Sequence, residues 1–149
     1  MAQRIFSFLL ALIFPALSCA TAIDDAQAAY ARFFTTFTTD NHEQLASLFA
    51  PDALFYGTGS TDVVTTHEGV ITYFRGALSG TRGETMARPL EHKALSLSDS
   101  VVVISGKWQS ERTLDGKMTT AGPSRVTAVM QKRGDQWFIV QFHNSPSPK

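Results

Sequence analysis

The sequence predicts an α+β fold in which helices come first and antiparallel strands follow. Three observations predict it: apolar side chains recur at helical spacing in the first half, segments of the second half alternate as strands do, and turn signals such as Asp115-Gly116 separate those segments. Runs of helices followed by runs of strands are typical of domains that pack helices on one face of a sheet. The 149 residues suffice for one such domain.

Composition excludes several classes of protein. Thirteen basic and 13 acidic side chains give a net charge of zero, which argues against a nucleic-acid partner. A hydrophobic fraction of 44% is too high for a disordered chain. Beyond the N-terminus no apolar run reaches the roughly 18 residues of a membrane span. We therefore expect a globular domain with no stable membrane span.

Residues 1–22 read as a secretory signal peptide. Arg4 supplies a positive start, Ile5 to Leu17 form an apolar stretch of signal length, and Ala20-Thr21-Ala22 fits an A-x-A cleavage site. We therefore expect residues 23–149 to form a single periplasmic or secreted domain. Cleavage two residues earlier and a retained N-terminal anchor are the alternatives.

Cys19 is the only cysteine, and it lies within the expected signal peptide. Its removal would leave no disulfide in the mature chain. A lipoprotein, with lipid on Cys19 as the new N-terminus, is a less favoured alternative. Lipid attachment sites usually have Leu three residues before the Cys, where this chain has Ala16.

The first helix is expected over residues 24–38. Asp24 and Asp25 suit the positive end of a helix dipole. Aromatic and small apolar residues then recur at spacings of three and four, which predicts one buried stripe. The stripe comprises Ala26, Ala29, Tyr30, Phe33, Phe34 and Phe37.

Two shorter helices are expected to follow. One spans 41–49, with Asp40 as N-cap, Glu43 completing a capping box, and Pro51 ending the helix. The other spans 70–78 and is closed by Gly80 and Gly83, with His67 before it as a cap or surface residue.

Five strands complete the expected fold. Pro89 makes the second of them an edge or bent strand, and the tail from Ser145 to Lys149 is expected to lie outside the sheet. The expected strands span residues 53–56, 86–97, 101–113, 124–133 and 137–145.

The last strand has two alternating faces. Phe138, Val140, Phe142 and Asn144 form the more apolar face, which we expect to cover the core. That arrangement places Asn144 at the rim of a pocket and His143 on the outer side.

Three stretches resemble one superfamily. They are Leu54 to Thr58 with Val64 to Phe74, Leu114 to Thr127 through its Asp-Gly turn, and Gln131-Lys-Arg-Gly-Asp-Gln-Trp-Phe-Ile-Val-Gln-Phe-His-Asn-Ser-Pro146. The chain resembles the nuclear transport factor 2-like (SnoaL-like) superfamily, in the branch of the calcium/calmodulin-dependent protein kinase II association domain and its small bacterial relatives. The resemblance implies a cone-shaped fold: a curved antiparallel sheet with three N-terminal helices enclosing a pocket. It also implies a sheet face that pairs in a homodimer.

The resemblance further implies a ligand cup lined by arginines, and this chain departs from it. The corresponding positions are Gln109, Ala128 and Asn144. An arginine recurs at the position of Arg125 in the bacterial relatives, where it could bind a carboxylate with two hydrogen bonds. The alternative is a surface Arg125 that pairs with Glu111.

Candidate site residues follow from the strand pattern and the resemblance together. For ligand binding they are Tyr56, His92, Gln109, Arg125 and Asn144, and for a dimer interface Trp137, Gln141 and His143. His92 is equally consistent with solvent. No metal site or cofactor is expected, because the histidines lack partners at ligand spacing.

The leading functional hypothesis is a homodimer that binds a small, partly apolar or acidic molecule without catalysis. An alternative is proton transfer or cyclisation, as in ketosteroid isomerase or SnoaL. The base would be one of Asp52, Asp62, Asp99 and Glu111, and the tyrosine donor one of Tyr30, Tyr56 and Tyr73. Carboxylates in turns are usually solvated, which weighs against that reading. A pure oligomerisation module is the second alternative.

Overall fold

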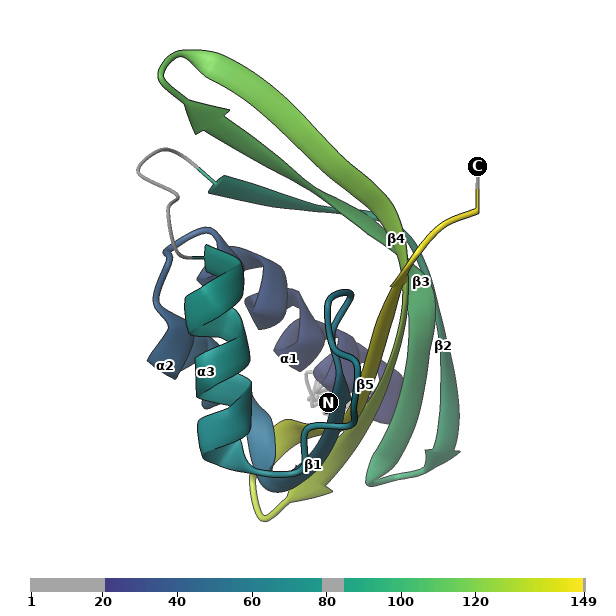
Figure 1. Ribbon diagram of the computed structural model, residues 1–149. Coiled ribbons are helices and arrows are strands. Elements are labelled where there is room, and N and C mark those ends of the chain that lie inside the picture. The colour runs from purple at the N-terminus through teal and green to yellow at the C-terminus, as the bar shows by residue number, and fades with distance from the viewer. Residues whose placement is uncertain (1–20, 79–84, 149) are drawn as a thin grey trace, which may run out of the picture.

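The computed structural model describes residues 21–78 and 85–148. Three helices pack against one face of a strongly curved five-stranded sheet, and this arrangement confirms the predicted α+β class (Figure 1). In chain order the elements are α1 (Ala22–Phe37), α2 (His42–Ala46), β1 (Phe49–Tyr56), α3 (His67–Leu78), β2 (Thr85–Ser98), β3 (Val101–Leu114), β4 (Lys117–Arg133) and β5 (Gln136–Pro146).

The aromatic stripe of α1 forms the centre of the core. Thr21 caps the helix: its hydroxyl accepts from the Asp24 N–H at 3.2 Å, and the Asp24 carboxylate accepts from the Thr21 N–H in return. The buried face then repeats every three to four residues, as the spacing predicted. Its members are Ala26, Tyr30, Phe33, Phe34, Thr36 and Phe37.

The segment after α1 differs from the prediction. Asn41, not Asp40, caps α2 through a 2.9 Å bond from the Gln44 N–H, while Asp40 takes a left-handed φ of 57°. The helix ends at Ala46, and Phe49 already belongs to β1. Pro51 lies inside β1 because this strand is at the sheet edge, where a missing N–H interrupts no ladder.

Helix α3 begins earlier than expected. The Thr66 hydroxyl accepts from the Gly69 N–H at 3.1 Å and so caps the helix, and His67 is its first residue. The expected closing residues Gly80 and Gly83 lie outside the described residues.

The sheet has the order β1-β5-β4-β3-β2. All neighbours are antiparallel except β1 and β5, which run parallel. Strand β2 is an edge strand with an irregularity between Pro89 and Glu91, as predicted. Strand β4 starts at Lys117, earlier than expected, so β3 and β4 extend beyond the helices as a long arm (Figure 1). Strand β5 continues through Pro146, one residue into the expected tail.

A bulge in β5 changes which face its residues occupy. Val129 pairs with Gln141 but Met130 pairs with Ile139, so Val140 is an extra residue. The buried residues are therefore Trp137 and Ile139 before the bulge, and Phe142 and Asn144 after it. Phe138 and Val140 were predicted to share the core face with Phe142 and Asn144, and this was wrong, since both are only half-buried. The extra residue of a bulge shifts the alternation of faces along the strand.

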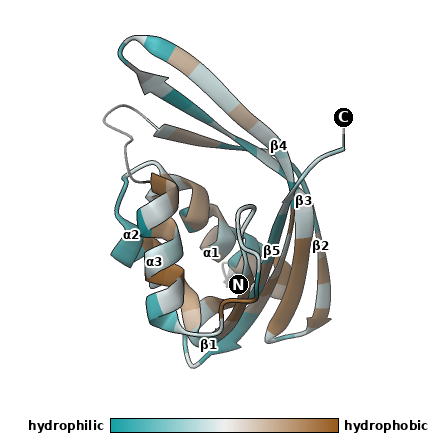
Figure 2. Ribbon diagram, in the orientation of Figure 1, coloured by the Kyte–Doolittle hydropathy of each residue, from teal (hydrophilic) through white to brown (hydrophobic). Residues whose placement is uncertain are grey.

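The core lies between the helices and the concave face of the sheet. Phe33 touches the rings of Phe49, Phe74 and Phe142, which joins α1 to β1, α3 and β5. The start of β3 is among the most hydrophobic parts of the sheet (Figure 2). Among the described helices none is long and apolar enough to cross a membrane.

Candidate functional site

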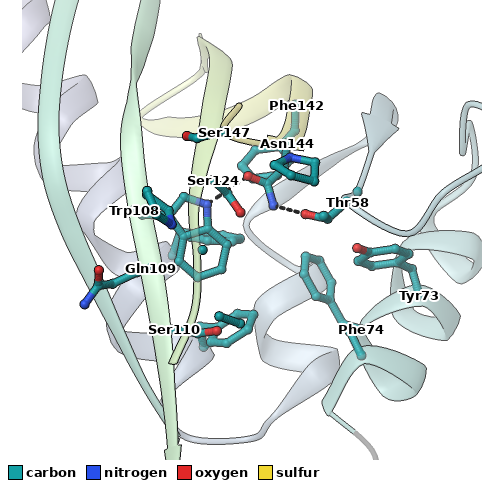
Figure 3. Close-up of a pocket in the computed structure, with 18 of the residues that line it drawn as sticks. Thr58, Tyr73, Phe74, Trp108, Gln109, Ser110, Ser124, Phe142, Asn144 and Ser147 are labelled. Carbon is teal, nitrogen blue, oxygen red and sulfur yellow. Dashed lines mark hydrogen bonds between the residues drawn. The ribbon is translucent and has the colours of Figure 1, made fainter. Parts of the chain in front are cut away.

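A cavity of about 500 Å³ lies between the helices and the upper part of the sheet. Its wall is largely apolar and includes several aromatic rings, with polar groups from the loop after β1 and from β3, β4 and β5 (Figure 3). The lining includes Thr58, Tyr73, Phe74, Trp108, Phe142 and Asn144.

A chain of hydrogen bonds crosses one side of the cavity. The Trp108 indole N–H donates to Asn144 Oδ1 at 2.9 Å, and Asn144 Nδ2 donates to Thr58 Oγ1 at 2.5 Å (Figure 3). Trp108 and Asn144 are only 6% and 7% exposed. The chain therefore connects β3, β5 and the loop after β1, from the buried Trp108 and Asn144 to the exposed Thr58.

The direction of this chain follows from its chemistry. An indole N–H can only donate, so the carbonyl oxygen of Asn144 must face Trp108. The amide nitrogen then faces Thr58, whose oxygen must accept. The orientation of the Asn144 amide is thus fixed by Trp108 alone.

Tyr73 of α3 contributes a second hydroxyl to the same side of the cavity as Thr58 (Figure 3). Its oxygen is 3.4 Å from the Gly59 backbone nitrogen, which donates to it. Its ring packs edge-on against Phe55 at 4.7 Å between centroids, which holds the phenol in place.

No ionisable acid, base or cation other than the weakly acidic Tyr73 phenol lines the described part of the cavity. The four candidate carboxylates lie elsewhere. Asp52 pairs with Arg133 on the surface, and this bond holds the Asp52 pKa below its usual range. Glu111 pairs with Arg88 at 3.0 Å, while Asp62 and Asp99 are exposed.

Two of the five predicted ligand-binding residues reach the cavity. Asn144 does so with its side chain. Gln109 lines it too, but its side chain points away and its Nε2 donates to Glu111 Oε1 at 3.2 Å (Figure 3). Tyr56 lies on the outer sheet face, with its ring 6.0 Å from that of His143.

His92 and Arg125 line a separate, shallower depression of about 420 Å³. The His92 ring packs against Tyr30 and Phe34, at 5.5 and 5.6 Å between centroids, and burial lowers its pKa. Arg125 is exposed, and its guanidinium is 3.5 Å from Ser145 Oγ. Arg125 is not paired with Glu111, which instead contacts Arg88.

The predicted interface residues separate into two groups. Trp137 is 7% exposed and belongs to the core of its own chain. Gln141 and His143 lie on the outer sheet face, as expected. Among the residues with described positions, no three histidine, cysteine or acidic side chains are grouped as metal ligands.

Thr58 and Trp108 were not among the predicted site residues, and Tyr73 was considered only as a tyrosine donor for proton transfer. Thr58 occurs in an ordinary turn cluster, and Tyr73 fits the apolar face of a helix. Trp108 was assigned to the core or an interface. The cavity brings together positions 58, 73, 108 and 144, and no local pattern relates residues so far apart.

A curved sheet and three helices around a largely apolar cavity define a cone-shaped, nuclear transport factor 2-like domain. The model of the SnoaL-like domain family matches residues 26–148, and the chain belongs to that family. No functionally curated protein matches the chain.

Solved structures agree with this assignment. One, from Xanthomonas campestris, is described as a calcium/calmodulin-dependent protein kinase II association domain. It is 26% identical, with a TM-score of 0.74 over 83% of this chain and 86% of that one. The hub homology domain of the same kinase from Chlamydomonas reinhardtii is 18% identical, with a TM-score of 0.71 over 87% and 100%. An NTF2-like protein of Novosphingobium aromaticivorans, with 11% identity and a TM-score of 0.71 over 82% and 79%, shares the fold.

Proposed function

We propose that this protein is an exported homodimer that binds a small, largely apolar molecule in its cavity and does not convert it. The observation that carries the proposal is the cavity itself, about 500 Å³ in volume, with a largely apolar lining that includes aromatic rings and a few hydrogen-bonding groups. Such a cavity has the size and lining of sites for small organic ligands.

The lining supports binding over catalysis. Proton transfer of the ketosteroid-isomerase kind requires a carboxylate in the pocket, and the described lining contains none. An ionised ligand is also disfavoured, because no described cation faces it and burial of an unpaired charge is costly. Of the two ligand types expected from the sequence, the apolar one is therefore favoured.

A row of side chains on the outer sheet face supports the homodimer. Cross-strand pairing aligns Leu95, Val103, Val129, Gln141 and Leu54 across all five strands. Leu95 and Leu54 are 62% and 51% exposed, and no residue of the row is charged. A second copy, rotated by a two-fold axis, would bury the row against itself.

The solved relatives named as association and hub domains support self-assembly through this fold. Export is supported by the sequence of residues 1–22. A full-length expression followed by cell fractionation tests it: the protein should appear outside the cytoplasm in a shortened form, and an unshortened cytoplasmic product would contradict export.

Native mass spectrometry of protein purified from its own host tests ligand binding. We expect a dimer that carries extra non-covalent mass. Ala77→Trp, which places a large ring in the cavity, should abolish that mass. Thr72→Trp adds the same ring on the exposed side of α3 and should retain it. Extra mass unaffected by Ala77→Trp would contradict binding in the cavity.

A further inference from the structure

Two hydroxyl groups that line the cavity, those of Thr58 and Tyr73, each accept a hydrogen bond and so have a proton to donate. The fixed Asn144 amide donates to Thr58 Oγ1, so the Thr58 oxygen already accepts a hydrogen bond. A hydroxyl that accepts still has its own proton to donate. That proton has no acceptor among the contacts of the described residues, and Thr58 lines the cavity.

The Tyr73 hydroxyl, like that of Thr58, accepts a hydrogen bond and has a proton left to donate. The Gly59 N–H donates to its phenol oxygen, and the phenol proton has no described acceptor. Thr58 and Tyr73 lie on one side of the cavity, opposite Trp108 and Gln109 (Figure 3). Two hydroxyl donors therefore face the side of the cavity that contains the Trp108 ring.

We infer that the cavity selects an uncharged ligand whose carbonyl-type oxygen accepts hydrogen bonds from Thr58 and Tyr73. This inference rests on the proposed binding function and specifies the ligand class. A ketone or aldehyde oxygen has two lone pairs and no proton, and therefore complements two donors. A carboxylate would also accept, but its charge would be buried without a cation in the described lining.

Three naphthalene probes of nearly equal shape test the inference. 2-Acetylnaphthalene carries the ketone, 2-isopropenylnaphthalene replaces its C=O by C=CH2, and 2-naphthoate carries a negative charge. Quenching of tryptophan fluorescence at pH 7.5 gives each Kd, because Trp108 lines the cavity. We expect the ketone to bind about three- to tenfold more tightly than the hydrocarbon, and naphthoate to bind most weakly.

Variants assign that preference to the two hydroxyls. Thr58→Val and Tyr73→Phe each remove one donor with little change of shape, and each should reduce the ketone's advantage over the hydrocarbon. Thr61→Val removes an exposed hydroxyl from the same loop, outside the cavity, and should leave the advantage unchanged.

The possible outcomes distinguish a failure of the carbonyl preference from a failure of ligand binding in the cavity. Equal binding of ketone and hydrocarbon, or tightest binding of naphthoate, would overturn the inference while the cavity remained a ligand site. An advantage of the ketone that survives in both Thr58→Val and Tyr73→Phe would also overturn it. Failure of all three probes to bind would overturn both.

Discussion

The phenol ring of Tyr73 lies directly against the α-carbon of Gly57. A β-carbon at position 57 would be 2.0 Å from Tyr73 Cζ, well inside van der Waals contact. Gly57 is therefore required for close approach and not for turn geometry. The absence of a side chain there lets the phenol reach the cavity beside Thr58.

Gly57→Ala should destabilise the protein and displace Tyr73. Overpacking of this kind typically costs about 1–3 kcal/mol, which urea unfolding would measure as a lower midpoint. Ligand affinity should fall as well, because the phenol moves. Gly59→Ala, where a β-carbon meets nothing within 4 Å, is the control and should unfold close to the wild-type midpoint. Equal midpoints for Gly57→Ala and wild type would show that the ring moves freely.

Trp108 and Asn144 should be energetically coupled. Trp108→Phe leaves the buried Asn144 oxygen without its donor, and Asn144→Ala leaves the indole N–H without its acceptor. Loss of one partner of a buried pair costs about 1–3 kcal/mol. In a double-mutant cycle by urea unfolding, the two variants should show a coupling of about 0.5–3 kcal/mol. Strict additivity would mean that the bond contributes nothing.

Stability should decrease below about pH 6.5 because of His92. Burial against α1 lowers the pKa of His92, and the nearby Glu91 carboxylate opposes this shift only in part. As the pH falls through the unfolded-state pKa, the unfolded chain binds a proton that the folded chain does not, so the free energy of unfolding decreases. The free energy of unfolding stops decreasing once the pH is below the pKa of His92 in the folded state.

Urea unfolding between pH 7.5 and 5 measures this dependence. His92→Gln should flatten the profile, because the ring that packs against Tyr30 and Phe34 no longer titrates. His67→Gln, at the exposed first residue of α3, is the matched control. An unchanged profile in His92→Gln would assign the dependence to another group.

The outer row should control assembly. Val129→Lys places a charge at the middle of the uncharged row and should convert the dimer to a monomer in light scattering, with the fold intact by circular dichroism. Met118→Lys, on the same strand but on the distal arm and 63% exposed, should remain dimeric. A dimeric Val129→Lys protein would place the interface elsewhere.

The start of α1 favours processing after Ala20 over processing after Ala22. Cleavage after Ala22 removes Thr21, which caps the helix with Asp24. Loss of such a cap typically costs about 1 kcal/mol. Cleavage after Ala20 makes Thr21 the first residue and places its amino group 3.1 Å from the Asp24 carboxylate. Intact mass of the exported protein should therefore begin at Thr21, and a mass beginning at Ile23 would contradict this.

Much of the fold was predictable because its signals are local. The stripe of α1, the turn at Asp115-Gly116 and the edge position of the strand containing Pro89 each depend on a few neighbouring residues. Asp40 and Pro51 were misassigned for the opposite reason. Asn41 caps α2 while Asp40 takes a left-handed conformation between α1 and α2. Whether Pro51 ends a helix or lies in an edge strand depends on the surrounding sheet.

The candidate site was predicted less well. The alternation of the last strand placed Asn144 at the rim of a pocket, and Asn144 lines the cavity. Arg125 shares the outer face with Thr127, since Val126 and Ala128 are buried, so the arginine points away from the cavity. Tyr56 lies on that same outer face, opposite His143, because pairing with β5 sets its orientation.

The α+β class, the order of elements and the aromatic core of α1 could be predicted from periodicity and turn signals, and the cone-shaped family from short motifs. These signals act over a few residues. The set of residues that meet in the cavity could not be predicted in this way, because it depends on the folded arrangement. The Val140 bulge puts Trp137 and Ile139 on the same face as Asn144, Gly57 admits Tyr73, and an indole N–H from β3 fixes an amide on β5. Each depends on the packing of segments distant in the chain, where sterics and hydrogen-bond direction act across strands and leave no local pattern.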